Sequence, residues 1–221
     1  MIKLHHLNNS RSQRLLWALE EIGLPYEIIR YERDPKTMFA PDSLKKVHPL
    51  GKAPVLVDGE ITLAESGAII EYLLQTHGNQ FLPEQSGKAY QNYLYWMHYA
   101  EGSLMPYLLL KLVFEKVKTS PMPFFVRPIA KAIADKATST FIGPNLDNHL
   151  KFINQHLSQN EWFAGDQLTG ADFQMSFPLE ACVARGIANQ QHPHIVNYVK
   201  RFQSRPAYQQ ALEKGGKYDY A

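Results

Sequence analysis

The chain has 221 residues, of which 45% are hydrophobic, and this length is enough for one large or two small cores. The formal net charge of +2 gives no basis for a nucleic-acid-binding surface. Cys182 is the single cysteine, so an internal disulfide is excluded and a reducing cytoplasm is the expected setting. No apolar run approaches the roughly 20 residues that span a bilayer, so we expect a cytoplasmic protein without a membrane partner.

The first elements alternate between strand and helix. Residues 2–7 (IKLHHL) have the composition of a strand, and the polar stretch 8–12 separates them from an amphipathic helix. Gly23 ends this helix, and Pro25 prevents its continuation. Residues 26–31 (YEIIRY) form a plausible second strand, so the chain begins with a strand, a helix and a strand. The apolar face of the helix carries Leu15, Leu16, Leu19 and Ile22.

The segment from His48 to Glu71 predicts a strand pair followed by a helix. Asp58 and Gly59 separate two apolar runs as a hairpin turn does. Ser66 occupies a natural N-cap position, and the free N–H groups that begin such a helix attract a carboxylate. Glu65 suits an ammonium group, so the pair favours a ligand that carries both charges. The alternative is that Ser66 only caps its helix and Pro54 only ends a strand.

Beyond residue 88 the pattern predicts helices and no strands. A long helix from Lys88 to about Lys118 should bend near Pro106, and another from Arg127 to Phe141 should be interrupted by Gly143 and Pro144 before it resumes at Asn145. The later helices are expected at 170–185, 193–204 and 206–214.

Three motifs carry a family resemblance: NNSRSQRLLWALEEIGLPYE, HPLGKAPVLVDGE and LAESGAIIEYL. They resemble the glutathione-binding half of cytosolic glutathione S-transferases, and the resemblance covers essentially the whole chain. It implies an α/β thioredoxin-like domain at 1–82, a linker at 83–88 and an all-helical domain at 89–221, in a homodimer. It also implies transfer of the glutathione sulfur to a small hydrophobic electrophile or a peroxide.

The resemblance also implies how glutathione would be held. The peptide bond before Pro54 is expected to be cis, and the backbone of Ala53 is expected to pair with the cysteinyl part of glutathione. Glu65 and Ser66 would hold the γ-glutamyl end. Lys52 stands where the family often has glutamine; its cation suits a glutathione carboxylate, although lysine is also common in exposed loops.

The group that activates the thiol is sought near the first helix. The family's tyrosine type has its phenol near the end of the first strand, where this chain has histidines, and residues 8–14 contain no cysteine. A serine-type member of a fungal or bacterial-like branch remains, with Ser10 as the first candidate and Asn9 and Ser12 as rivals. The alternative is purely structural, since Ser10 and Gln13 match the S-x-x-Q capping box.

The second half supplies the expected acceptor pocket and a structural motif. In the resembling family the first long helix of the helical domain faces the glutathione site, which makes Tyr107, Leu108 and Phe114 candidates for the pocket and Tyr218 a candidate to close over it. Thr169 and Asp172 match a capping box, and we expect a structural role for them.

Three functions are compatible with this sequence. The first is a glutathione transferase with glutathione as co-substrate. The others are a glutathione-dependent peroxidase and a non-catalytic glutathione-binding protein on the same fold. The nine histidines lack cysteine partners and metal-ligand spacing, so no metal is expected.

Overall fold

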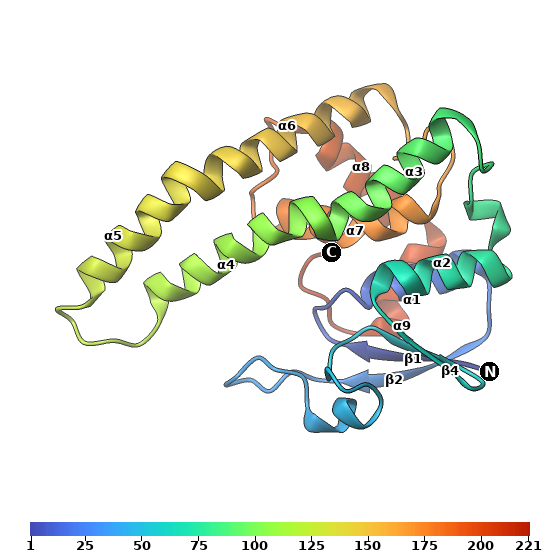
Figure 1. Cartoon of the computed structure of the whole chain (residues 1–221), viewed down its shortest axis with the longest axis horizontal. Coiled ribbons are helices and arrows are strands. Elements are labelled where there is room, and N and C mark those ends of the chain that lie inside the picture. The colour runs from blue at the N-terminus through green and yellow to red at the C-terminus, as the bar shows by residue number, and fades with distance from the viewer.

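The computed structural model describes all 221 residues and comprises a small sheet with its helices and a larger helical part (Figure 1). The predicted thioredoxin-like first part and helical second part are confirmed. The elements of the first part are β1 (Ile2–Leu7), α1 (Gln13–Ile22), β2 (Tyr26–Tyr31), a 3-10 turn (Asp42–Lys46), β3 (Val55–Asp58), β4 (Ile61–Ala64), α2 (Ser66–His77) and a second 3-10 turn (Asn79–Phe81).

The four strands form one sheet in the order β2-β1-β3-β4. Strand β1 pairs in parallel with β2 and antiparallel with β3, so Leu4 lies between Ile28 and Leu56. Leu4 and Leu56 are fully buried, because the central strands are covered by helices. Gly59, at φ 58°, makes the predicted hairpin turn between β3 and β4.

Helix α1 joins the two parts of the molecule. Trp17 lies at the centre of this junction with no exposed surface. Its ring centroid lies 4.7 Å from that of Phe173, 5.0 Å from Phe202 and 5.8 Å from Tyr208. Aromatic side chains of this size dominate the burial of a core, so the sheet domain and the helical part share one core at this point.

The helical part places a long pair of helices beyond the rest of the molecule. Helices α4 and α5 extend away from the sheet and meet at a loop at the far end (Figure 1). None of the helices combines the length and the apolar composition that a membrane crossing requires. The elements are α3 (Gly87–Tyr99), a π-helical turn (Ala100–Leu104), α4 (Met105–Thr119), α5 (Arg127–Ala137), a second π-helical turn (Thr138–Ile142), α6 (Gly143–Gln159), α7 (Gly170–Ala184), α8 (Pro193–Gln203) and α9 (Pro206–Gly215).

The helical part departs from the expected helices at its two π-helical turns. The long helix expected from Lys88 is interrupted by the π-helical turn Ala100–Leu104, and Pro106 stands in the first turn of α4, which follows it. The interruption expected at Gly143 and Pro144 is wrong, because these residues begin α6 and the irregular turn lies just before them. Proline is tolerated in the first turn of a helix, where its missing N–H would have no partner in any case.

The capping motif at the start of α7 is formed by buried groups. One carboxylate oxygen of Asp172 accepts hydrogen bonds from the Thr169 N–H at 2.8 Å and from the Thr169 hydroxyl at 3.1 Å. The other accepts from the Phe163 N–H and the Tyr198 hydroxyl, each at 2.9 Å. Burial raises the pKa of Asp172 to about 6, although these hydrogen bonds oppose the shift. The motif therefore ties α7 to the preceding loop and to α8.

Candidate functional site

A cavity of about 940 Å³ opens where the chain leaves β1. Residues 7–11 (with the exception of Asn8) and 50–53 form one side of it, and Phe177 of α7 contributes from the helical part. Of the predicted site residues, the cavity brings together Asn9, Ser10, Lys52 and Ala53. The peptide bond between Ala53 and Pro54 is cis. The remaining lining residues belong to the loop between β2 and β3: Glu32, Arg33, Asp34, Thr37, Phe39, Ala40, Pro41, Asp42 and Lys45.

Ser10 has a fixed hydroxyl at the wall of this cavity. The residue is 5% exposed, and its Oγ accepts a hydrogen bond from the Ser12 N–H at 3.2 Å. The Ser12 hydroxyl lies 2.7 Å from the same oxygen. A hydroxyl has one donor and two acceptor positions, so Ser10 can accept from both Ser12 groups and still donate its own proton.

Ser12 connects Ser10 to the end of β1. Its side chain is fully buried, and its Oγ lies 2.9 Å from His6 Nδ1 and 3.2 Å from the Leu7 carbonyl oxygen. It also accepts a hydrogen bond from the Leu7 N–H at 3.2 Å. Burial lowers the pKa of His6 to about 4, so its imidazole is neutral at neutral pH. Ser12 therefore lies behind Ser10 and does not line the cavity.

Asn9 uses its side chain to hold the C-terminal tail. Its Nδ2 donates to the Asp219 carboxylate at 2.7 Å, and its Oδ1 accepts from the Asp219 N–H at 2.9 Å. Its φ of 49° lies in the left-handed region, which asparagine tolerates better than most residues. Both ends of the Asn9 amide are thus engaged within the chain.

The capping box that was the alternative role for Ser10 and Gln13 is not formed. Helix α1 begins at Gln13 with Ser12 in the N-cap position, and no side chain caps it. Ser10 contributes only its backbone carbonyl, which accepts from the Gln13 N–H at 3.2 Å. The reason is that the Ser10 hydroxyl turns toward Ser12 rather than toward the helix.

The start of α2 differs by one residue from the expectation. Glu65, not Ser66, is the N-cap residue, and its φ of 70° is rare for a residue with a side chain. Ser66 is the first helical residue, and its Oγ accepts a hydrogen bond from Arg14 at 2.7 Å. Non-glycine residues held at positive φ concentrate at ligand sites, and the exposed Glu65 side chain stands directly beside the N–H groups that begin α2.

Arg14 is a site residue that the sequence analysis missed. It is fully buried, and its Nη1 donates to Ser66 Oγ, to Glu101 Oε1 at 2.7 Å and to Gln174 Oε1 at 2.9 Å. Its Nε and Nη2 have no hydrogen-bond partner within the chain. The available signal was a lone arginine directly before the apolar Leu15 and Leu16, since such a cation requires buried partners.

Glu101 also forms an ion pair with Arg11 at the edge of the cavity. Arg11 Nε lies 2.9 Å from both carboxylate oxygens. Burial opposes ionisation of Glu101, but the Arg14 and Arg11 guanidinium groups outweigh it and hold the pKa of the carboxyl below its usual value. Both guanidinium groups also lie over the Phe177 ring, at 5.9 Å for Arg11 and 5.6 Å for Arg14. Positive charge is thus concentrated between Ser10 and α7.

Known proteins of one family match the sequence of this chain. Residues 1–75 match the model of the glutathione S-transferase N-terminal domain, and residues 122–206 match that of the C-terminal domain. The chain is 38% identical over 215 residues to glutathione S-transferase 3 of Schizosaccharomyces pombe, covering 97% of this chain and 88% of that protein. The chain belongs to the glutathione S-transferase family.

Two further relatives support this assignment. Glutathione S-transferase 1 of Saccharomyces cerevisiae is 38% identical over 224 residues, covering 97% of this chain and 95% of that protein. The crystal structure of a glutathione S-transferase from Actinobacillus pleuropneumoniae is 36% identical with a TM-score of 0.77, covering 97% of this chain and 93% of that one.

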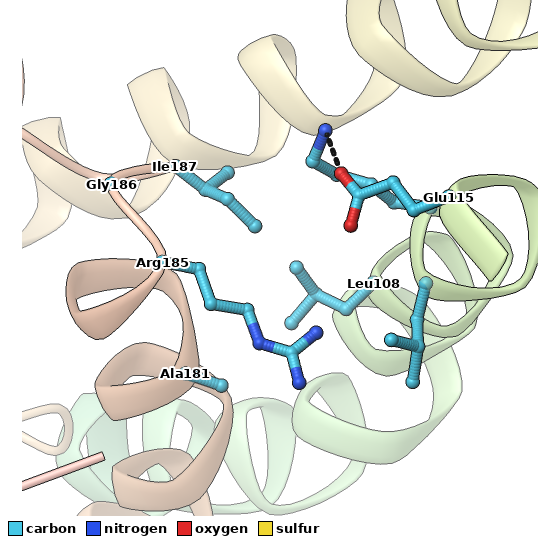
Figure 2. Close-up of a pocket in the computed structure, with 8 residues that line it drawn as sticks. Leu108, Glu115, Ala181, Arg185, Gly186 and Ile187 are labelled. Atoms are coloured by element: carbon cyan, nitrogen blue, oxygen red, sulfur yellow. Dashed lines mark ion pairs between the residues drawn. The ribbon is translucent and has the colours of Figure 1, made fainter. Parts of the chain in front are cut away.

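This glutathione S-transferase has a second cavity of about 560 Å³ between α4 and α7 (Figure 2). Leu108 lines it, together with Arg185 at the end of α7. Tyr107 lies elsewhere, with its ring 5.9 Å from Phe141 and 5.2 Å from His149. The structure thus separates two of the three candidate acceptor residues, because neighbouring positions of a helix face different directions. The third, Phe114, packs against the main core and lines neither cavity.

The tail of the transferase differs from the expectation that Tyr218 closes over the acceptor. The Tyr218 hydroxyl donates to Glu180 at 2.9 Å, so the side chain points inward. Tyr220 instead contacts a residue that lines each cavity. Its ring meets Phe177 edge-on at 5.8 Å, and its hydroxyl accepts from Arg185 at 3.0 Å. Tyr220 therefore connects Phe177, which lines the first cavity, with Arg185, which lines the second.

Proposed function

We propose that this protein transfers the sulfur of glutathione to an electrophile and that Ser10 stabilises the glutathione thiolate. The observation that carries the assignment is the buried Ser10 hydroxyl on a cavity wall that also includes Lys52 and Ala53. The glutathione S-transferase relatives support the reaction class. The rivals are less suitable, since Asn9 is engaged with Asp219 and Ser12 is fully buried.

The chemical task is to keep the thiol ionised at neutral pH. A free cysteine thiol has a pKa of about 8.5, and each unit of depression requires about 1.4 kcal/mol in favour of the thiolate. A hydrogen bond from the Ser10 hydroxyl supplies part of this, because the Ser12 N–H occupies one acceptor position of Ser10 Oγ and the hydroxyl proton can turn to the sulfur. Arg11 and the N-terminus of α1 add positive potential. The thiol proton leaves to solvent, and the sulfur then forms the new bond to the electrophile.

We assign the other contacts of glutathione to this cavity and to the start of α2, whose Glu65 and Ser66 do not line the cavity. The Ala53 backbone, next to the cis bond to Pro54, is assigned to the cysteinyl part, and Lys52 to a carboxylate. Glu65 and Ser66 are assigned to the γ-glutamyl ammonium and carboxylate groups. The buried Arg14 holds the Ser66 hydroxyl in place. The acceptor is assigned to the second cavity, of which Leu108 is a wall.

We also propose a homodimer, with a domain boundary at residues 83–88. Several exposed apolar side chains lie on the projecting helix pair α4 and α5, and exposed apolar surface can mark an interaction site. The exposed apolar residues of α4 and α5 are Leu109, Leu110, Val113, Val117, Ile129 and Ile133. Sedimentation analysis should give twice the chain mass, and a monomer would refute the proposed homodimer.

Ultraviolet titration of the bound glutathione thiolate tests the role of Ser10. We expect a thiol pKa one to two units below the free value in the wild type, a return toward the free value in Ser10→Ala, and retention in Ser10→Thr, which keeps the hydroxyl. Glutathione affinity, measured in parallel, should change little in all three. An undepressed pKa in the wild type, or an unchanged one in Ser10→Ala, would overturn the assignment. Turnover with a haloarene and with a hydroperoxide separates transferase from peroxidase activity.

A further inference from the structure

The second cavity carries a cation that no carboxylate of the chain neutralises. We propose that Arg185 anchors the carboxylate of the acceptor, so that the enzyme favours electrophiles with an apolar body and an anionic end. This inference rests on the proposed transferase function and names the acceptor class of its second cavity.

The two cavities follow one another along α7. Phe177 lines the first cavity, whereas Ala181 and Arg185 line the second. These residues are spaced by four and eight positions, so they lie on one face of the helix. Eight residues of an α-helix span about 12 Å. An acceptor whose reactive carbon lies near Ser10 and Phe177 would reach Arg185 along this face by passing Tyr220, whose ring lies 5.8 Å from Phe177 and 5.4 Å from the Arg185 guanidinium carbon.

Of the charged side chains that line the second cavity, Arg185 has no ion-pair partner. Lys111 forms an ion pair with Glu115 at 2.9 Å, drawn as a dashed line in Figure 2. Arg185 has no carboxylate within ion-pair distance, and its one hydrogen bond goes to the Tyr220 hydroxyl at 3.0 Å. Its guanidinium group extends from α7 into the space facing α4 (Figure 2). The cavity thus retains one positive charge.

The shape of the guanidinium group suits a carboxylate. It has five N–H donors in a planar fork that binds a carboxylate through two parallel hydrogen bonds, and Tyr220 occupies only one of its nitrogens. The Tyr220 ring lies 5.4 Å from the guanidinium carbon, which holds the fork at the cavity. We assign Tyr220 as a positioning residue for Arg185.

The remaining walls suit an apolar body. Leu108 and Leu112 of α4 and Ile187 after α7 face the same space. Such a mixture of apolar walls and one convergent charge is typical of small-molecule sites. Addition to an α,β-unsaturated ketone illustrates the reaction: the sulfur forms a bond to the β-carbon, the carbon–carbon π bond breaks, and the α-carbon takes a proton from water.

Ethacrynic acid and its methyl ester test the proposal, because they share one unsaturated ketone and differ in the anionic end. In Arg185→Gln, the ratio of KM for the acid to KM for the ester should rise about three- to tenfold, with little change in kcat for the acid. Arg185→Lys keeps the charge without the fork and should give an intermediate ratio. Lys200→Gln removes an exposed cation of α8, outside both cavities, and should leave the ratio unchanged.

The outcomes separate the two proposals. If wild-type protein conjugates neither compound with glutathione, the proposed function fails. If it conjugates the ester but Arg185→Gln leaves the KM ratio at the wild-type value, or if Lys200→Gln raises the ratio equally, only the role of Arg185 is overturned. For Tyr220→Ala, a rise in the KM ratio at unchanged kcat supports the positioning role, and an unchanged ratio removes it.

Discussion

The Arg14 guanidinium group donates a hydrogen bond to the Glu101 carboxylate at 2.7 Å, across 87 residues of sequence. Arg14 belongs to α1, and Glu101 belongs to the π-helical turn between α3 and α4. The same guanidinium nitrogen holds Ser66 and Gln174. One buried cation thus fixes the positions of both domains around the start of α2, where the γ-glutamyl end of glutathione is assigned.

Replacement of Arg14 by methionine should destabilise the protein by about 3 kcal/mol, because the buried oxygens of Ser66 and Gln174 lose their charged donor and Glu101 keeps only Arg11. Arg11→Met is the matched control. Arg11 binds the same carboxylate but is 39% exposed, so its loss should reduce the free energy of unfolding by less than about 1 kcal/mol. Urea unfolding of the three proteins measures both values. Equal destabilisation by the two substitutions would show that the burial of Arg14 does not increase its contribution to the free energy of unfolding.

Ser12→Ala should reduce catalysis through Ser10. It removes the hydroxyl 2.7 Å from Ser10 Oγ while the Ser12 N–H remains, so we expect a fall in kcat/KM of about tenfold, smaller than in Ser10→Ala. A double-mutant cycle checks this, since residues that act as a unit are not additive. The double variant should be no slower than Ser10→Ala alone. Strictly additive losses would mean that Ser12 acts by another route.

Asp172→Ala should destabilise the fold and leave the chemistry unchanged. The substitution removes four hydrogen bonds to a fully buried carboxylate, and we expect a loss of about 3 kcal/mol in the free energy of unfolding. Asp172→Asn keeps one acceptor and should lose less. Thermal unfolding and glutathione binding, measured together, provide the check. A variant of normal stability with lost glutathione affinity would contradict the structural role.

Glu180 should make stability depend on pH. Burial raises the pKa of this carboxyl to about 7, although hydrogen bonds from Tyr208, Gln203 and Tyr218 oppose the shift. The folded state therefore holds this proton more tightly than the unfolded state, in which the pKa is about 4.3. Between these two values the contribution of Glu180 to stability falls as pH rises.

Glu180→Gln isolates that contribution from the histidines, whose lowered pKa values act in the opposite direction. Relative to the wild type, the variant should gain about 3 kcal/mol of stability between pH 4.3 and 7.5. Urea unfolding at several pH values measures the difference. A stability difference independent of pH would place the titration of Glu180 outside this range.

Local patterns were sufficient to predict most of the fold. The strand from Ile2 to Leu7, the hairpin at Gly59 and the end of α1 at Gly23 depend on neighbouring residues, and the structure contains all three. Gly143 and Pro144 were misjudged because the sequence does not reveal that a π-helical turn precedes them.

The candidate site was less accessible to sequence reasoning. The loop residues Ser10 and Lys52 lie within recognisable motifs, and they line one cavity. The partners of Arg14 come from three distant segments, and no local pattern reveals such pairings. The direction of the Ser10 hydroxyl also depends on Ser12 and His6, so the sequence left capping open as an alternative to ligand binding.

The packing of Trp17 determines how the two domains unfold. Its ring belongs to the sheet domain, yet Phe173, Phe202 and Tyr208 surround it from three helices of the other part. Neither part can open without exposing this cluster to water, so melting of one removes support from the other. The two domains should therefore unfold together in one cooperative transition, and indole fluorescence should report the loss of both at once.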